Sequence, residues 1–276
     1  MMIINAIPYM LLAFNIKNVL IGGAAVGVLG LILGVALGFV GKVFFVKVDE
    51  KEIEVRGCLP GNNCGGCGYA GCSDFAKALA EGKADLKGCG PSSDEDKAEI
   101  AKILGIPYSK QEKRVATVHC AGGKVSLNKY EYVGNAGCVA QMGLMGGSKV
   151  CPNGCLGGGT CESVCPYHAI KVIDGVAYVE KALCTACGVC AINCPKKIVE
   201  LIPARATVYV ACSTTCKGKE VMNMCKVGCI GCGLCAKNCP NGAITMVNNV
   251  AVIDYSKCTG CKVCVSKCPR KCIKEF

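Results

Sequence analysis

The chain has 276 residues, of which 27 are cysteine, with only 5% aromatic residues and no tryptophan. Such a composition supplies a thin apolar core, so disulfides or bound metal must help to hold the folded state. The cysteines form short ladders with two residues between neighbours, and an odd number of them cannot pair completely. This pattern favours shared metal sites in a reducing compartment over a disulfide framework.

The formal net charge of +11 would suit a nucleic-acid-binding protein, but it omits any metal site. An oxidised [4Fe–4S] core with four thiolates carries a charge of about −2. The cysteine ladders described below predict about five such sites, which would together contribute about −10. The loaded protein would then be close to neutral, with the lysines between the cysteines as local compensation. We therefore expect no nucleic-acid partner, although a remaining basic patch could steer an acidic protein.

The N-terminal segment, residues 1–46, is strongly apolar, and the run Val19–Gly41 is long enough to cross a bilayer as a helix. A cleaved signal peptide is the alternative, but the run is too long for one and no small-residue cleavage site follows it. We predict a retained single-pass anchor in the cell (plasma) membrane, with residues 1–14 at its interface. Lys42, Lys47 and Lys51 follow the anchor and Lys17 alone precedes it, which places the rest of the chain in the cytoplasm.

Glycines recur at helical spacing in this anchor, at positions 23 and 27 and again at positions 30, 34 and 38. Small residues in this spacing let a second helix approach closely. Chance is the alternative, because glycine is frequent in membrane helices generally. We expect a partner helix to pack here.

A charged linker is predicted over residues 47–56, followed by a small helical module over residues 57–108. Helices are expected at 73–81 and 92–104, the second with a capping box of Ser92 and Glu95 and a stop at Gly105. A glycine-rich loop carries a C-x2-C-x4-C-x16-C pattern, whose amides could hydrogen-bond to cluster sulfides. One [4Fe–4S] cluster is predicted in this module, on Cys64, Cys67, Cys72 and Cys89.

The remaining residues contain an internal repeat, in which 151–202 aligns with 225–276 at an offset of 74 residues. Each copy holds a predicted hairpin, 170–173 with 176–179 and 244–247 with 250–253, whose Asp-Gly and Asn-Asn turns suit positive φ angles. We predict an α+β chain with a transmembrane helix, the small module and tandem 2[4Fe–4S] bacterial-ferredoxin-like units at 109–204 and 205–276. One position departs from the repeat, because Cys232 aligns with Gly158.

The pattern C-x2-C-x2-C-x3-C-Pro occurs three times in this region. In two-cluster ferredoxins, three cysteines of such a ladder bind one cube and the fourth binds the neighbouring cube. Structural zinc, the alternative, prefers two separated ligand pairs. Three clusters follow from this crossing-over: Cys165 with Cys184, Cys187 and Cys190; Cys239 with Cys258, Cys261 and Cys264; and Cys268 with Cys229, Cys232 and Cys235.

A fourth ferredoxin-type site would use Cys155, Cys161 and Cys194 but lacks a ligand at Gly158. We predict that Cys151 takes that place, and a three-iron cluster is the alternative. About five clusters result, and seven cysteines stay unassigned, either as small buried residues or as ligands of one or two further clusters. These are Cys58, Cys120, Cys138, Cys212, Cys216, Cys225 and Cys272.

Two of the unassigned cysteines share a feature: Cys120 and Cys212 both follow strand-like runs, at 115–119 and 206–211. This suggests that the repeat begins before Cys151. The two histidines, His119 and His168, are expected to serve packing or surface roles. No phosphate-binding glycine motif and no catalytic acid, base or nucleophile is evident.

The order of a glycine-rich anchor, a C-x2-C-x4-C-x16-C module and a ferredoxin array resembles the B subunit family of the Rnf complex, the bacterial ion-translocating ferredoxin:NAD+ oxidoreductase. The stretch from Leu59 to Cys72 carries most of the likeness, and the long array resembles the clostridial type. The resemblance implies that reduced ferredoxin donates electrons to the chain, which relays them to membrane redox subunits. It further implies coupling within the complex to NAD+ reduction and to Na+ or H+ translocation, with the other Rnf subunits as partners.

Two other classes of protein remain open at this point. The chain could be the relay subunit of another membrane hydrogenase or dehydrogenase, although the module with four cysteines argues for the Rnf type. A redox sensor or cluster-storage protein would instead present a few exposed cysteines of low pKa rather than paired ladders.

Overall fold

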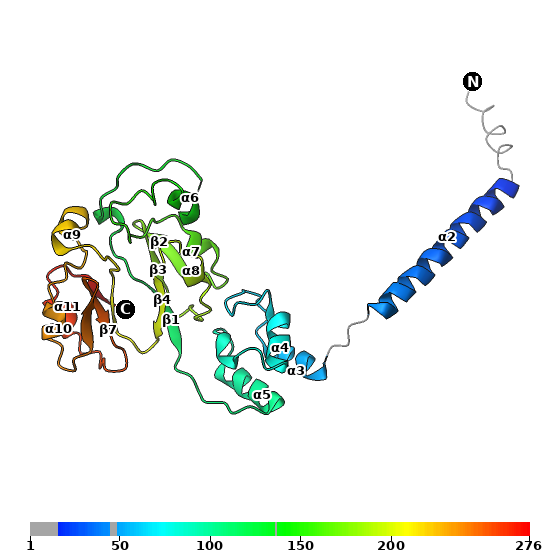
Figure 1. Ribbon diagram of the computed structural model, residues 1–276, viewed down its shortest axis with the longest axis horizontal. Helices are drawn as coiled ribbons and strands as arrows, with labels where there is room; N and C mark the ends of the chain where they lie inside the picture. The colour runs from blue at the N-terminus through cyan, green and yellow to red at the C-terminus, as the bar shows by residue number, and fades with distance from the viewer. Residues whose placement is uncertain (1–15, 45–48, 136) are drawn as a thin grey trace, which may run out of the picture. The chain divides into compact units, whose positions relative to one another are not determined.

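A computed structural model describes residues 16–44, 49–135 and 137–276. The chain divides into two compact units, Met1–Asp49 and Glu50–Phe276 (Figure 1). The predicted interfacial segment, residues 1–14, lies outside the described residues.

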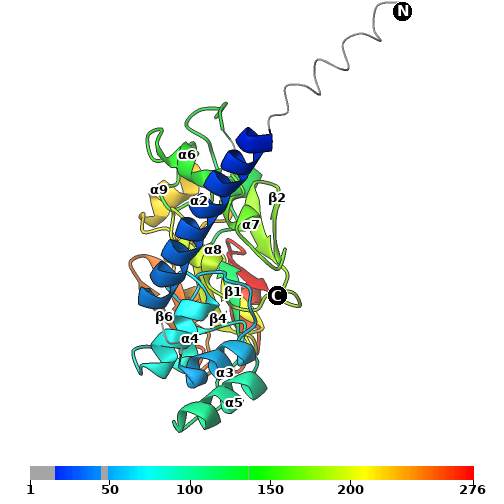
Figure 2. The ribbon, with the colours of Figure 1, turned by 90° about the vertical axis from the view of Figure 1, so that its right-hand side faces the viewer.

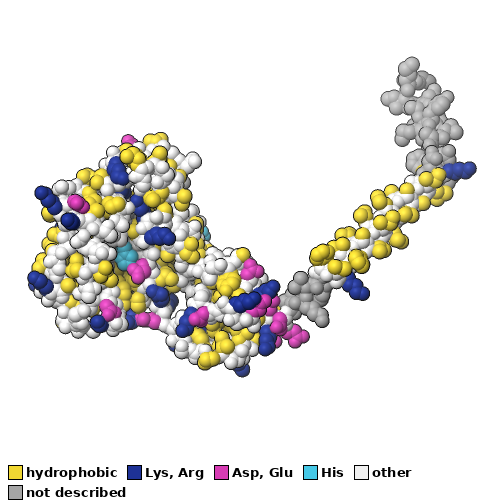
Figure 3. Space-filling model, viewed as in Figure 1, with side chains coloured by type: hydrophobic (Ala, Val, Ile, Leu, Met, Phe, Trp, Pro, Cys, Tyr) yellow, Lys and Arg dark blue, Asp and Glu magenta, His cyan; other side chains and the backbone are white. Residues whose placement is uncertain are grey.

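Helix α2, Ile16–Val43, forms the described part of the first unit. Its segment Val19–Val43 has a mean hydropathy of 2.5 and is long and apolar enough to cross a membrane, the one such helix among the described residues. Apolar side chains cover it and basic side chains lie near both ends (Figure 3). The predicted helix is confirmed, whereas its partner helix and its orientation stay predictions.

The small module packs three helices, which gather together in Figures 1 and 2. They are α3 (Glu50–Cys58), α4 (Cys72–Ala80) and α5 (Asp94–Leu104), with a short 3-10 turn, η1, at Leu86–Gly88. Val55, Phe75 and Ile100 are almost fully buried in their shared core. The expected linker is thus a helix from Glu50 onward, because its single buried valine, Val55, packs inward while its charged residues stay outside.

Helix α5 begins one residue later than the predicted capping box implies. The Ser93 hydroxyl accepts a hydrogen bond from the Asp96 amide at 3.0 Å, and the Asp96 carboxylate accepts one from the Ser93 amide at 3.2 Å. Ser92 is buried, and its hydroxyl lies 3.4 Å from the Cys89 sulfur, so it is not available as a cap. The stop at Gly105 is confirmed by its left-handed φ of 68°.

Strands in the Cys-rich region pair as four separate two-stranded antiparallel sheets. The two predicted hairpins form with the expected bounds, β2 (Ile170–Ile173) with β3 (Val176–Val179) and β6 (Ile244–Val247) with β7 (Val250–Ile253). Their turn residues Asp174, Asn248 and Asn249 have positive φ angles, as predicted. The other sheets join β1 (Arg114–Val118) to β4 (Val199–Pro203) and β5 (Val208–Val210) to β8 (Ile273–Glu275).

Short helical turns between these strands carry or flank the cysteine ladders. They are η2 (Gly123–Val125), α6 (Cys138–Met142), α7 (Thr160–Ser163), α8 (Val189–Ile192), α9 (Gly218–Met224), α10 (Leu234–Lys237) and α11 (Val263–Lys267). In the two larger apolar clusters of the region, cysteines pack among valines and isoleucines. The core and the candidate ligands therefore occupy the same space.

Candidate metal centres

Site II, defined by Cys165, Cys184, Cys187 and Cys190, has all four predicted cysteines around one small pocket. The Ala169 amide donates to the Cys165 sulfur and the Ala116 amide to the Cys184 sulfur, each at 3.4 Å. Such amide–sulfur hydrogen bonds favour thiolates and tune the potential of a bound cluster. The structure thus brings this predicted ligand set together.

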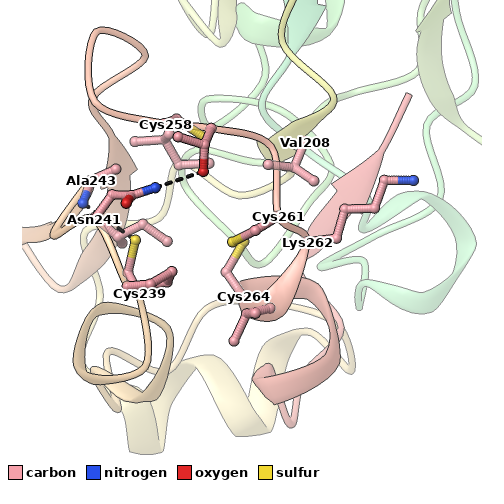
Figure 4. Close-up of a pocket in the computed structure, with 13 residues that line it drawn as sticks. Val208, Cys239, Asn241, Ala243, Cys258, Cys261, Lys262 and Cys264 are labelled. Atoms are coloured by element: carbon pink, nitrogen blue, oxygen red, sulfur yellow. Dashed lines mark hydrogen bonds between the residues drawn. The ribbon is translucent and has the colours of Figure 1, made fainter.

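Site V, defined by Cys239, Cys258, Cys261 and Cys264, is the equivalent pocket in the second copy (Figure 4). The Ala243 amide donates to the Cys239 sulfur at 3.3 Å, which repeats the bond at Ala169 in site II. A hydrogen bond of 2.6 Å from the side-chain amide of Asn241 to the Thr259 hydroxyl joins the two loops that carry these cysteines. This predicted set also surrounds a single space.

Site III differs from the prediction in one of the cysteines that the structure groups together. The pocket that contains Cys155, Cys161 and Cys194 is completed by Cys138, at the start of α6, and not by Cys151. Burial raises the pKa of the Cys161 thiol to about 12, and the charges of Cys155, Cys138 and Cys194 contribute to the rise, which places all four sulfurs near one another.

Gly158 explains why Cys138 reaches site III. A Cβ atom at Gly158 would lie 2.7 Å from the backbone nitrogen of Cys138 and equally close to the side-chain amide of Gln141. The start of α6 therefore fills the space that a cysteine at position 158 would need. Sequence spacing could not predict the place of Cys138, because this cysteine belongs to no ladder. The available signals were the interruption of the ladder at Gly158 and an unassigned cysteine upstream of it.

Cys151 lies instead in a separate pocket, where Cys120, Cys212 and Cys225 are its sulfur neighbours. None of these three cysteines was assigned from the sequence. The Cys225 side chain is buried, and Cys120, Cys151 and Cys212 are partly buried.

Site IV is defined by Cys229, Cys232, Cys235 and Cys268. Burial raises the pKa of the Cys235 thiol, and the charges of the other three cysteines add to this rise, so the predicted set lies together. Cys232 is the exposed member of the set. A fifth thiol, Cys272, lies 3.5 Å from the Cys268 sulfur.

Site I, in the small module, is defined by Cys64, Cys67, Cys72 and Cys89. Burial raises the pKa of the Cys67 thiol, and the charges of Cys89 and Cys64 raise it further. The Asn63 side chain accepts a hydrogen bond of 2.8 Å from the Cys72 amide and so holds the loop against the start of α4.

The donor chemistry of these five sites fits [4Fe–4S] clusters. Their ligands are thiols, which are soft donors typical of iron–sulfur centres. Within the described residues, no three His, Cys, Asp or Glu side chains converge closely enough to hold a single ion. A cube instead spreads four thiolates over four irons. Burial also raises the pKa of the Cys190 thiol to about 12, so deprotonation at neutral pH requires a bound metal.

Sites I, II and III lie in direct succession. At Gly66 and Gly90, an added Cβ would lie 2.0 Å from the Cys187 carbonyl oxygen and 2.3 Å from the Ala186 carbonyl oxygen, so the module meets site II backbone to backbone. The Cys64 charge contributes, after burial, to the raised pKa of Cys187. In the same way, the charge of Cys161 in site III contributes to the raised pKa of Cys190 in site II.

These thiolate sites, in a chain that also carries a helix of membrane-spanning length, define a membrane-associated iron–sulfur protein of the electron-transfer class. Residues 59–91 match the FeS family, described as an Fe-S cluster, and residues 228–272 match the 4Fe-4S dicluster domain family.

Curated relatives extend this likeness over nearly the whole chain. The B subunit of the Na+-translocating ferredoxin:NAD+ oxidoreductase complex of Acetobacterium woodii is 43% identical over 94% of this chain and 78% of its own length. The B subunit of the ion-translocating oxidoreductase complex of Methanosarcina acetivorans is 40% identical over 94% and 99%. The proton-translocating counterpart of Clostridium ljungdahlii is 40% identical over 90% and 89%. The chain belongs to this family of B subunits and is part of an oxidoreductase complex, as the sequence resemblance predicted.

Proposed function

We propose that this chain accepts electrons from reduced ferredoxin and relays them through [4Fe–4S] clusters at sites I to V toward the membrane redox subunits of its complex. Within that complex the transfer is coupled to NAD+ reduction and ion translocation. The relatives support this assignment, because two of them are named as ferredoxin:NAD+ oxidoreductase subunits. One is named for Na+ and the other for protons, so the coupling ion of this chain is left open.

The close succession of sites I, II and III is the observation that carries the proposal. Each [4Fe–4S] cluster supplies a one-electron couple when bound. The residues of the chain set the distances between sites: the glycine loops let the module touch site II, and the crossed ladders hold sites II and III side by side. Valine and isoleucine side chains around the pockets exclude water, which lowers the dielectric constant around each site.

The arrangement of the chain follows from the same proposal. Residues 109–204 and 205–276 act as two ferredoxin-like units, residues 57–108 as a single-cluster module and α2 as a single-pass anchor that packs against membrane helices of other subunits. The iron–sulfur units lie in the cytoplasm, on the side of soluble ferredoxin.

The substitution Cys187→Ala tests the relay. Because Cys187 lies in site II next to the module, its loss should remove about four irons per chain and lower ferredoxin-dependent NAD+ reduction by the complex at least tenfold. Membrane attachment should be unchanged, since α2 is a separate unit. Iron content, sulfide content and the rate with reduced ferredoxin measure these effects.

Cys58→Ala is the matched control, because Cys58 ends α3 in the module and belongs to none of the five sites. Its iron content and rate should equal those of the unchanged complex. A Cys187→Ala complex that keeps the full ferredoxin-dependent rate would refute the proposed relay.

A further inference from the structure

A pocket between the two repeat copies is lined by four cysteines that the five sites leave over. We propose that a sixth [4Fe–4S] cluster binds there, at a junction site formed by Cys120, Cys151, Cys212 and Cys225. This inference rests on the proposed function only in that the other sites hold clusters of the same kind.

The four cysteines are two pairs of equivalent residues. Cys151 and Cys225 align in the 74-residue repeat. Cys120 and Cys212 each lie two residues after the first strand of their copy, since β1 ends at Val118 and β5 at Val210. Each copy therefore contributes the same two positions to one pocket, which is unexpected for cysteines retained only as small packing residues.

Backbone contacts hold these segments in place across the junction. Ser126 and Cys225 form an antiparallel bridge, and the Leu127 amide donates to the Met224 carbonyl at 2.9 Å. His119 adds a third tie, because its Nδ1 atom lies 2.7 Å from the Val210 carbonyl. The histidine thus has a packing role beside the pocket, as the sequence predicted.

Amide–sulfur hydrogen bonds at the junction match those at the ladder sites. The Gly122 and Cys155 amides donate to the Cys120 sulfur at 3.3 and 3.4 Å, and the Cys229 amide donates to the Cys212 sulfur at 3.3 Å. Sites II and V show the same bond at 3.3 to 3.4 Å. Cys120 and Cys212 therefore have the same amide–sulfur hydrogen bonds as the cysteines of the ladder sites.

Glycines make room around these sulfurs. A Cβ at Gly122 would lie 3.5 Å from the Cys225 sulfur and 3.6 Å from the Cys120 sulfur, so one backbone position faces both ligands. A Cβ at Gly228, on the segment that carries Cys225, would lie 3.7 Å from the Cys225 sulfur. Val221 and Met224, both buried, close the apolar side of the pocket.

A buried lysine supplies the charge that such a site needs. The Lys149 side chain is only 8% exposed, and its ammonium donates to the carbonyls of Gly123 and Ser126, at 2.7 and 3.4 Å. No salt bridge joins it to a carboxylate in the part of the chain that the structure describes. Burying a cation without an anion is costly. A cluster with four thiolates has a net charge of about −2. Bound through Cys151, two positions after Lys149 in the sequence, it would provide the missing negative charge.

The chemistry of the lining selects an iron–sulfur cluster. No Asp, Glu, Lys or Arg side chain lines the pocket, and its strong metal donors are the four thiols, with His119 held by the Val210 carbonyl. A zinc ion would draw four cysteines onto one point, whereas no three such side chains among the described residues converge on a single ion. Four soft thiol donors that share a pocket without converging on one point suit an iron–sulfur cube.

The position of the junction site gives it a role in the relay. The amide of Cys155, a site III ligand, bonds to Cys120, and the amide of Cys229, a site IV ligand, bonds to Cys212. The junction site therefore lies between sites III and IV and joins the two ferredoxin-like units into one row of six centres.

Iron counting and EPR on the anaerobically purified full-length chain test the junction site. Six cubes give about 24 irons per chain and five give about 20. We expect about 24 for the unchanged chain and about 20 for Cys120→Ser/Cys225→Ser, with the reduced EPR signals of the other sites retained. Cys216→Ser is the matched control, because Cys216 packs against the small apolar cluster of Val221, Met224 and Cys225 without lining the pocket, and it should keep about 24 irons.

About 20 irons in the unchanged chain, or one zinc in place of the additional four irons, would overturn the junction site while the relay through sites I to V stands. The count of the unchanged chain decides this even if the double variant folds poorly. Failure of the proposed function has a different signature, a full ferredoxin-dependent rate in Cys187→Ala.

Discussion

At the residue scale, Gly158 and Cys138 show how a segment from outside the ladder brings a fourth cysteine to the site III pocket. In the second copy the ladder supplies Cys232 at this position, whereas in the first copy glycine leaves space for a distant segment. The Thr160 hydroxyl accepts a hydrogen bond of 2.7 Å from the Cys138 amide and fixes that segment beside the ladder. A side chain at position 158 would therefore overlap the segment that brings Cys138 to the site III pocket.

We predict that Gly158→Ala loses the site III cluster, about four irons per chain, because the added Cβ would overlap the Cys138 backbone nitrogen at 2.7 Å. Iron analysis and the reduced EPR spectrum measure the loss. Gly57→Ala is the control, because an added Cβ in α3 meets no described atom within 4 Å other than those of its own helix backbone and chain neighbours. Unchanged iron in Gly158→Ala would mean that Cys138 is not the ligand.

Ladder spacing predicted the sets of sites II and V because their ligands come from a loop and its repeat partner within one unit. It did not predict Cys138 at site III, since spacing along the chain carries no information about a segment that returns through space. The grouping of Cys120 with Cys212 was predicted only in part. Their strand-like flanks indicated an earlier start of the repeat but not that both copies meet at one pocket.

At the element scale, the alternating apolar pattern and turn residues predicted both hairpins with correct bounds. Residues 50–56 of the predicted charged linker form most of helix α3, which the charged composition did not indicate because only one of these residues, Val55, is buried. The pairing of β1 with β4 and of β5 with β8 joins segments far apart in sequence, and no local pattern specifies it. The same holds for the contact between the module and site II.

The double substitution Gly66→Ala/Gly90→Ala should separate the module from site II. Both added Cβ atoms would lie within 2.3 Å of backbone carbonyl oxygens, and relieving such overlap costs about 1–3 kcal/mol per position. Iron content should stay unchanged while the magnetic coupling between sites I and II in reduced EPR spectra weakens. Gly143→Ala, whose nearest described neighbour is 3.4 Å away, should keep the coupling, and equal coupling in both variants would contradict the proposed contact.

At the scale of the whole molecule, we expect the proposed cytoplasmic units to depend on bound iron–sulfur clusters for stability. Every sheet in the described chain has two strands, and isolated two-stranded sheets are marginal in water. Cysteines of sites II to V pack inside the two apolar clusters that these sheets cover. The iron–sulfur clusters would therefore serve both as electron carriers and as the centre of each core, which explains how a chain with so few aromatic residues folds.

Iron removal should consequently unfold residues 109–276 while leaving α2 helical. Without metal the buried thiols must be protonated, the sulfur-lined pockets lose their contents, and metal-binding free energy no longer supports folding. Oxidative chelation of the detergent-solubilised chain should abolish strand signals in circular dichroism and make this region sensitive to protease, whereas a fragment containing residues 16–44 survives in the micelle. The module should resist longer, because Phe75 and Ile100 give it an apolar core of its own. Protease resistance of residues 109–276 after complete iron loss would show that the strands and aliphatic side chains hold the fold without the iron–sulfur clusters.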